Sequence, residues 1–241
     1  MKENTPHLDR TVPFFLASFP RAGSTWMRFL IANVFNYEKK AYPEIDFFNI
    51  HEIVPEYGKS DTFSFADCPK IFKTHEPYQA VFQDTILILR DPFDTLYSYC
   101  DMLNRNRGLA LSLEETIAHE KYGIAALVAH ANSYIRECAH LLIITYERMQ
   151  RNPVAELKKI LDFLEFKTRD DIIRGAVKRS EFKIMDRIEK KKGRKIGNPM
   201  FKHIRSGKIG QGRKAIERDR WLYDYVIQEM KKSPLLYLLY N

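Results

Sequence analysis

A short turn of small residues, PRAGSTW at positions 20–26, could bind an anion. Gly23 lets the backbone approach a ligand closely, and Ser24 and Thr25 offer hydroxyl groups at the start of a predicted helix, whose positive end attracts negative charge. The turn has a single cation, Arg21, and it lacks the Lys of the triphosphate-binding pattern GxxxxGKS or GxxxxGKT. By itself, the turn is equally typical of a phosphate-binding loop and of a structural strand-to-helix connection.

Two further segments carry side chains suited to acid–base and phosphate chemistry. KTHEP contains Lys73 and His75, and an imidazole titrates near neutral pH, so it can accept a proton from an attacking group. Residues two apart in a strand point to the same side, so both side chains could face one ligand. RDPFDTLYSY begins with Arg90, whose planar guanidinium suits a phosphate. Asp91 and Asp94 are more typical of the cap region of a helix than of a metal site.

The elements that must position these residues alternate between strands and helices. Short apolar runs predict buried parallel strands at 12–19, 70–73, 85–89 and 141–145. Helical spacing of apolar residues predicts helices at 26–35, 93–103, 113–137, 153–163 and 168–178. This alternation predicts an α/β fold, with three layers (α/β/α), a central parallel sheet and a P-loop-like phosphate-binding turn. No linker divides residues 1–241, so we expect a single domain with its site at the carboxyl ends of the strands.

Composition excludes several classes of protein. With 45% hydrophobic and 13% aromatic residues in a chain of 241, there is enough apolar surface for a core, which excludes a disordered protein. The apolar runs are far shorter than the roughly 18 to 20 residues of a membrane helix, and the polar N-terminal stretch lacks the apolar part of a secretory signal. We therefore expect a cytoplasmic protein. Cys68, Cys100 and Cys138 are odd in number and widely spaced, so we expect reduced thiols and no zinc site.

Positive charge is concentrated toward the C-terminal end. The whole chain has 39 basic and 31 acidic residues, a net charge of +8, whereas residues 187–214 contain 11 basic residues and one acidic residue. A solvated basic loop and a clamp for a polyanionic ligand explain this segment equally well.

Five motifs, taken in order, resemble those of the sulfotransferases that use 3'-phosphoadenosine 5'-phosphosulfate (PAPS) and release its desulfonated form, PAP. PRAGSTW is similar to the family's phosphosulfate loop, PKSGTTW, and LILRDPFDTLYSY is similar to its 3'-phosphate motif. Residues 144–164 resemble the tyrosine-containing segment of the cytosolic members, and Phe182 lies where they have TSF. FKHIRSGKIGQGRK resembles their RKGxxGDWK loop. The resemblance covers most of the chain and implies a soluble, cytosolic-type sulfotransferase.

The resemblance also implies where PAPS and PAP bind. The turn around Gly23 would hold the 5'-phosphate, and Arg90 and Ser98 would hold the 3'-phosphate, with the segment 205–207 closing over it. The full set of residues that the resemblance assigns to the donor is Arg21, Ala22, Gly23, Ser24, Thr25, Trp26, Arg90, Ser98, Tyr146, Phe182, Arg205, Ser206 and Gly207.

Aromatic residues would complete this donor site. By the same resemblance, Trp26 and Phe182 would sandwich the adenine and Tyr146 would reach it with a hydrogen bond, although core packing is the commoner role of such rings. Two positions depart from the family pattern, because Ser206 replaces a frequent Lys and Gly212 stands where the loop often has Trp.

The implied reaction is an in-line transfer that uses no metal. His75 would act as the general base for the acceptor, and Lys73 would place positive charge beside the transferred oxygens. Arg21 occupies the position where most members have Lys, and it would stabilise the bridging oxygen as the S–O bond breaks. A planar guanidinium is not equivalent to an ammonium, so this departure affects the leaving group directly.

The acceptor is expected to be a small molecule with a hydroxyl or amine group. Residues 42–57, 78–82 and 99–123 are candidates for its binding surface, and the acidic residues in the first of these segments are interpreted as solvated. Two other functions stay open at this point: an ATP-dependent kinase, which would require the missing loop lysine, and a nucleic-acid-binding protein that relies on the basic segment. The residues after 214 do not specify an oligomeric state.

Overall fold

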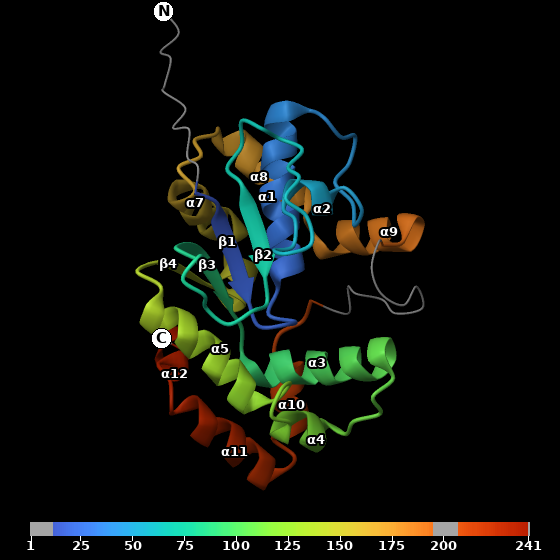
Figure 1. Ribbon diagram of the computed structural model, residues 1–241. Helices are drawn as coiled ribbons and strands as arrows, with labels where there is room; N and C mark the ends of the chain where they lie inside the picture. Colours follow the sequence, from blue (N-terminus) through green and yellow to red (C-terminus); the bar gives the residue numbers. More distant parts are fainter. Residues whose placement is uncertain (1–11, 195–206, 241) are drawn as a thin grey trace, which may run out of the picture.

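Four parallel strands form the centre of the molecule. The computed structural model describes residues 12–194 and 207–240, and its sheet has the strand order β2-β1-β3-β4 (Figure 1). The strands are β1 (Phe14–Ser18), β2 (Ile71–Thr74), β3 (Asp84–Leu89) and β4 (His140–Thr145). Every neighbouring pair runs in parallel, so the predicted parallel sheet is confirmed.

Both faces of this sheet are buried, which explains why its strands are continuous apolar runs in the sequence. Side chains of β1 alternate between two hydrophobic cores: Phe14 and Leu16 enter one core, and Phe15 and Ala17 enter the other. The alternation follows from the two-residue period of a strand. A sheet with a core on each side requires a helical layer over each face, and the structure has both.

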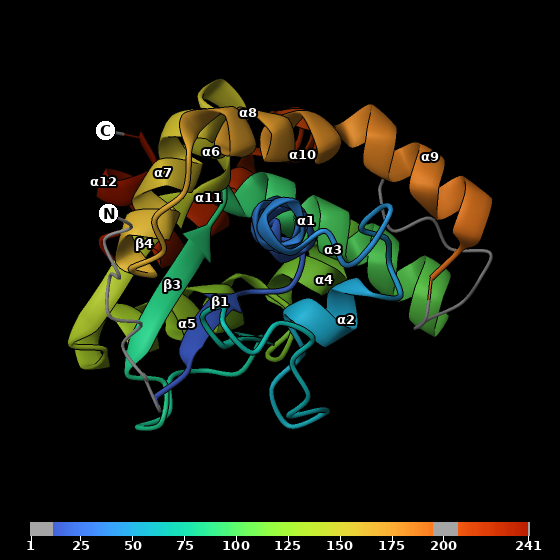
Figure 2. The same ribbon diagram turned by 90° about the horizontal axis from the view of Figure 1, so that it is seen from above.

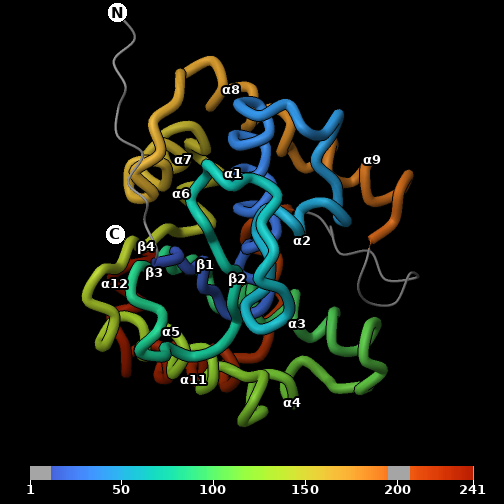
Figure 3. Tube along the Cα trace, turned by 45° about the horizontal axis from the view of Figure 1, so that its top comes forward, coloured from blue at the N-terminus to red at the C-terminus, as the bar shows by residue number. Residues whose placement is uncertain are grey.

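Helices cover the two faces in separate groups (Figures 1 and 2). The core that contains Phe14 is covered by α1 (Ser24–Lys39), α2 (Ile50–Ile53), α6 (Tyr146–Arg151), α7 (Pro153–Phe163), α8 (Asp170–Arg179) and α9 (Phe182–Lys192). The core that contains Phe15 is covered by α3 (Pro92–Arg107), α4 (Leu113–Ala118), α5 (Ile124–Glu137), α10 (Gln211–Ile216), α11 (Arg220–Met230) and α12 (Leu235–Tyr240). Figure 3 shows the strands between these two groups, as the predicted three-layer α/β/α fold requires.

The single helix predicted at 113–137 is wrong, and part of the basic segment 187–214 forms a helix that the sequence analysis did not predict. The helical stretch 113–137 is divided into α4 and α5, because the chain turns sharply before Gly123, where an added Cβ atom would lie 2.2 Å from the carbonyl oxygen of Ile117. The start of the basic segment 187–214 is helical, since residues 187–192 form the end of α9.

Two expectations about the chain as a whole can be compared with the described residues. Cys68, Cys100 and Cys138 are free thiols, as expected for reduced cysteines. Among the helices within residues 12–194 and 207–240, none has the length and apolar character needed to cross a membrane.

The carboxyl ends of all four strands lie at the same edge of the sheet. β1 ends at Ser18, β2 at Thr74, β3 at Leu89 and β4 at Thr145. In open α/β sheets, ligands bind in the crevice beyond these ends. Each of the four strands is followed here by a segment that contains a predicted site residue.

Candidate active site

The turn after β1 has an unusual backbone that brings it against a side chain at the start of α6, directly after β4. Arg21 and Gly23 have positive φ angles of 73° and 115°, and Gly23 is the N-cap of α1. A Cβ atom on Gly23 would lie 2.7 Å from Cδ2 of Tyr146, so only glycine fits. The first N–H groups of a helix have no partner within it, and the helix dipole adds positive charge there. The start of α1 is therefore suited to an anion.

A cavity of about 580 Å³ lies at this edge of the sheet. It is large enough for a small-molecule ligand. Ala22 is buried under the turn and does not line the cavity, and Arg205 and Ser206 lie outside the described residues. The predicted site residues that line the cavity are Arg21, Gly23, Ser24, Thr25, Trp26, Lys73, His75, Arg90, Ser98, Tyr146, Phe182 and Gly207.

The imidazole of His75 is held in one orientation by the end of the neighbouring strand. Its Nδ1 lies 2.6 Å from the carbonyl oxygen of Ser18, which can only accept, so Nδ1–H donates and Nε2 carries the lone pair. The segment that follows is also fixed, because the hydroxyl of Tyr134 donates to the carbonyl of Glu76 at 2.9 Å. Burial, with a smaller contribution from Lys73, lowers the pKa of His75 to about 3. The imidazole is therefore neutral at physiological pH.

Lys73 is a buried cation with a single close carboxylate. Its side chain pairs with Glu56, with Nζ 3.4 Å from Oε2, and Glu56 also pairs with Lys59 at 2.8 Å. Burial lowers the pKa of Lys73, Glu56 opposes this shift and the charge of Arg28 adds to it, and the resulting pKa is about 8. Burial raises the pKa of Glu56, but Lys73 and Lys59 outweigh it and bring that pKa to about 2. Glu56 thus keeps a proton on a lysine that would otherwise lose it.

Arg28 is a cavity residue that the sequence analysis missed. It lies one turn into α1 and is 6% exposed. Its guanidinium donates to the carbonyl oxygens of Val54 at 2.6 Å and Ile50 at 3.1 Å, and so fixes the loop that carries Glu56. Burial lowers its pKa to about 10, and Glu56 partly compensates. The signal in the sequence was an arginine inside the otherwise apolar stretch 26–32 of this helix.

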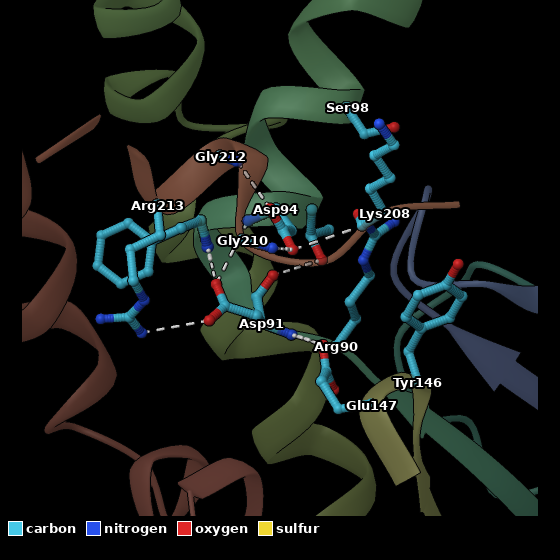
Figure 4. Close-up of polar contacts among 12 residues, drawn as sticks. Arg90, Asp91, Asp94, Ser98, Tyr146, Glu147, Lys208, Gly210, Gly212 and Arg213 are labelled. Atoms are coloured by element: carbon cyan, nitrogen blue, oxygen red, sulfur yellow. Dashed lines mark hydrogen bonds and ion pairs between the residues drawn. The ribbon is translucent and has the colours of Figure 1, made fainter. Parts of the chain in front are cut away.

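Arg90 connects the turn to a segment near the C-terminus (Figure 4). Its guanidinium donates to the carbonyl oxygens of Arg21 at 3.1 Å and Lys208 at 3.4 Å, and it lies 3.9 Å from Asp94. Arg21 Nε in turn donates to Oγ of Ser98 at 3.1 Å. The residues predicted for the two phosphates are therefore parts of one connected group.

Aromatic rings form another part of the wall. The Arg90 guanidinium lies 4.4 Å from the ring centroid of Tyr146, and Trp26 packs edge-on against the same tyrosine at 5.7 Å. The hydroxyl of Tyr146 donates to the carbonyl oxygen of Gly207 at 3.3 Å. An added Cβ atom on Gly207 would lie 2.8 Å from the Phe182 ring, so this ring packs directly on the glycine. Tyr146 thus links Arg90 to Trp26 and Gly207, and Gly207 in turn contacts Phe182.

The two aspartates after Arg90 are cap-region residues, as predicted. Asp91 is the N-cap of α3, and its Oδ1 accepts a hydrogen bond from the N–H of Phe93 at 2.8 Å. Its Oδ2 accepts from Arg213 at 3.2 Å and from the hydroxyl of Tyr240 at 2.8 Å. Within the described ranges, no group of three or more His, Cys, Asp or Glu side chains is placed to hold a metal ion.

The remaining wall of the cavity combines apolar and polar side chains. Of the segments predicted for the acceptor, 42–57 and 99–123 contribute to it, whereas residues 78–82 do not. Of the acidic residues in the first segment, only Glu56 reaches the cavity, while Glu44 and Asp46 pair with Lys192 instead. The lining residues beyond those predicted for the donor include Phe47, Ile50, His51, Tyr99, Met102, Asn106, Arg107, Gln150, Met185 and Arg194.

Comparison with protein families and curated proteins gives a consistent result. The family model for the Sulfotransferase domain matches residues 12–232. Cytosolic sulfotransferase 17 of Arabidopsis thaliana is 27% identical over 239 residues, which cover 82% of this chain and 67% of that protein. Sulfotransferase 1A1 of Mus musculus is 24% identical over 193 residues, which cover 70% of this chain and 65% of that protein.

Solved structures share the fold. A mouse sulfotransferase, SULT7A1, complexed with PAP, matches 92% of this chain and 85% of its own with a TM-score of 0.66 and 18% identity. Retinol dehydratase, in complex with androsterone and PAP, matches 92% of this chain and 81% of its own with a TM-score of 0.67 and 18% identity.

Proposed function

The chain belongs to the sulfotransferase family, and on that premise we propose that it transfers a sulfuryl group from PAPS to a hydroxyl or amine of a small-molecule acceptor. Membership makes it a transferase, and PAP in the two similar solved structures supports PAPS as the donor. The cavity at the carboxyl ends of the strands is the proposed site for both substrates.

The residues around the turn fit a donor with two phosphate groups. The start of α1 would hold the 5'-phosphate through the backbone near Gly23 and the hydroxyls of Ser24 and Thr25. Arg90 and Ser98 would hold the 3'-phosphate. Arg90 Nε is buried and has no hydrogen-bond partner among the described residues, so the guanidinium keeps a donor that a phosphate oxygen can satisfy.

His75 would act as the general base. The acceptor oxygen attacks sulfur in line, the S–O bond to the 5'-phosphate breaks, and the acceptor proton passes to Nε2. The bond from Nδ1 to the carbonyl of Ser18 supports this assignment, because it leaves Nε2 unprotonated. The low pKa of His75 keeps the free imidazole neutral. A bound anionic donor would raise that pKa toward the range useful for catalysis.

Two cations would stabilise charge as the sulfuryl group moves. Lys73 lies two residues before His75 and lines the same cavity, so its ammonium can interact with the transferred oxygens. Arg21, in the phosphate-binding turn, would interact with the bridging oxygen of the leaving PAP. Its bond to Ser98 fixes the guanidinium and couples the leaving-group end of the donor to the 3'-phosphate end.

The acceptor part of the cavity favours a small hydroxylated compound with apolar surface. Phe47, Ile50, Tyr99, Met102 and Met185 are apolar or aromatic residues that line it. Polar groups such as Asn106 could orient a ring or chain substituent. This lining is compatible with a phenol or a lipid alcohol.

The observation that carries the proposal is the convergence of four strand ends on one cavity. The turn after β1, His75 after β2, Arg90 after β3 and Tyr146 after β4 meet there, and Gly207 closes the group from the far end of the chain. Each of these residues has a functional or backbone group suited to the part of PAPS that it would contact.

Calorimetric titration with PAP in the absence of metal tests the donor site. We expect one-to-one binding, and we expect ATP with magnesium to bind much more weakly. Preference for ATP with magnesium would support the kinase alternative, and salt-sensitive binding of RNA or DNA without PAP binding would support the nucleic-acid alternative. Turnover is then measured with labelled PAPS and panels of phenols, lipid alcohols, sugars and amines.

A further inference from the structure

Asp94 has no role in the chemistry proposed above, yet it is 2% exposed at the edge of the cavity. Its carboxylate accepts two backbone hydrogen bonds, from the N–H of Gly210 to Oδ2 at 2.6 Å and from the N–H of Gly212 to Oδ1 at 2.7 Å (Figure 4). These donors lie 116 and 118 positions later in the chain. A charged side chain with so little exposure normally persists only where such partners satisfy it.

The glycines allow this contact because they let the backbone come unusually close. An added Cβ atom on Gly212 would lie 2.1 Å from the carbonyl oxygen of Phe93. Gly210 has a φ angle of 83°, a left-handed conformation that favours glycine. The path of residues 207–212 over the start of α3 therefore depends on glycine at positions 210 and 212.

The segment held by Asp94 forms part of the proposed donor site. Gly207 lines the cavity, and its carbonyl oxygen accepts from the hydroxyl of Tyr146 and from Nε2 of Gln150. The carbonyl oxygen of Lys208 accepts from Arg90. A shift of this segment would move contacts made by both Arg90 and Tyr146.

A carboxylate 3.9 Å from Arg90 would repel a phosphate if its charge were not compensated. The two glycine N–H groups and the positive end of α3 supply that compensation. The carboxylate of Asp94 thus interacts with the backbone of residues 207–212 rather than with the ligand.

We propose that Asp94 is a positioning residue for the donor, which holds residues 207–212 against Arg90 so that the 3'-phosphate meets a preassembled surface. This inference rests on the proposed function, and it assigns Asp94 no contact with the donor or the reacting atoms. Preassembly lowers the ordering cost of binding, so its loss weakens donor binding without slowing the chemical step.

The variant Asp94→Asn keeps the shape of the side chain but can accept only one of the two N–H groups. We expect PAP binding to weaken by about 10- to 100-fold, the range for charge-assisted hydrogen bonds. The KM for PAPS should rise by a similar factor, while kcat at saturating PAPS stays within about twofold. Hydrogen exchange at the amides of Gly210 and Gly212 should become faster. A merely structural role would not produce this split between KM and kcat.

The matched control is Asp101→Asn on the same helix, where the aspartate pairs with Arg105 and does not line the cavity. Unchanged PAP affinity in folded Asp94→Asn overturns the inference, as does a fall in kcat with no change in KM. If Asp94→Asn does not fold, Gly212→Ala displaces the same contact through Phe93, and unchanged PAP affinity there overturns the inference instead. Absence of PAP binding by the wild-type protein would overturn the proposed function itself, which separates the two failures.

Discussion

Removing the charge of Glu56 should shift the pH dependence of turnover. In the structure, Glu56 Oε2 lies 3.4 Å from Nζ of Lys73, and a parallel β-bridge between the two residues holds their backbones together. The other charged or titratable groups that act on Lys73 or lie beside it are Arg28, Lys59 and His75. Among Glu56 and these three groups, only Glu56 is an anion. Glu56→Gln therefore removes the attraction that retains the lysine proton and leaves the repulsions in place.

The size of the shift can be worked from this geometry. Two unit charges at this distance interact by about 5 kcal/mol at an effective dielectric constant of about 20. Glu56 is partly exposed and shared with Lys59, so we take about a third of that value, which corresponds to about one pKa unit. The pKa of Lys73, about 8 in the wild-type protein, should then fall to about 7. The direction is fixed because loss of a neighbouring negative charge always disfavours the ammonium.

The assay is kcat as a function of pH at saturating PAPS and acceptor. Turnover should fall as pH rises through the pKa of Lys73, because the proposed reaction uses the protonated form. Protonation of Lys73 at pH 7.5 would fall from about three quarters to about one quarter, so kcat should be about threefold lower in Glu56→Gln, with little change at pH 6. Glu181→Gln is the control, since Glu181 lines the same cavity without an ion pair to Lys73. An unshifted alkaline limb, or an equal loss of kcat at every pH, would refute the reasoning.

Three other perturbations test the base, the 3'-phosphate ligand and a buried histidine. His75→Ala should lower kcat by about 100-fold or more and leave PAP affinity unchanged, and retained turnover would exclude it as the base. Arg90→Ala should weaken PAP binding by about 1.5 to 3 kcal/mol in calorimetry, whereas exposed Arg105→Ala should not, and equal affinities would remove Arg90 from the site. Burial lowers the pKa of His130 to about 4, so between that value and 6.5 the unfolded chain binds a proton that the native protein does not. His130 should therefore contribute about 2 kcal/mol to the fall in the free energy of unfolding from pH 7 to pH 5, beside a similar contribution from His75, and urea titrations that show the same slope in His130→Gln would contradict this.

Features encoded within a short stretch could be predicted from the sequence. The strand, turn and helix around Gly23 follow from local residue types, and the structure confirms them. Asp91 could be assigned as a cap because Pro92 follows it at the first helical position. The helix predicted at 153–163 has the same bounds in the structure for a similar reason, since Asn152 caps it and a proline begins it.

One predicted helix was wrong and one helix was not predicted, although the sequence contained a signal for each. Gly123 interrupts the stretch 113–137, and a glycine inside a helical pattern marks a possible break. Apolar side chains at 182, 185 and 188 have helical spacing, but α9 was not predicted, and the lysines at its end were counted in a basic segment interpreted as a solvated loop or a clamp. In both places the helical spacing of apolar residues stood beside a second local feature, a glycine in the first case and a run of lysines in the second.

Contacts between distant segments could not be predicted in this way. Nothing in the spacing of Glu56 shows that its loop pairs in parallel with Lys73, and nothing near Asp94 shows that Gly210 and Gly212 return to it. The spacing of apolar residues indicates which side of a helix or strand a residue occupies. The residue that it contacts on a distant segment depends on the path of the whole chain. The residues that orient the predicted site were therefore the ones that sequence reasoning missed.

The departures from the family motifs are coupled to these long-range contacts. Gly212 replaces a frequent tryptophan, and the structure leaves no room for any side chain there, because a Cβ atom would lie 2.1 Å from the carbonyl oxygen of Phe93. Without an indole to pack the loop, the hydrogen bonds to Asp94 hold it instead. Arg21 replaces a frequent lysine, and its Nε donates to Oγ of Ser98 at 3.1 Å. A planar guanidinium fixes the direction of this hydrogen bond, which an ammonium would not. On the proposed function, the altered motif positions would thus still hold each end of the donor, by contacts that involve different atoms.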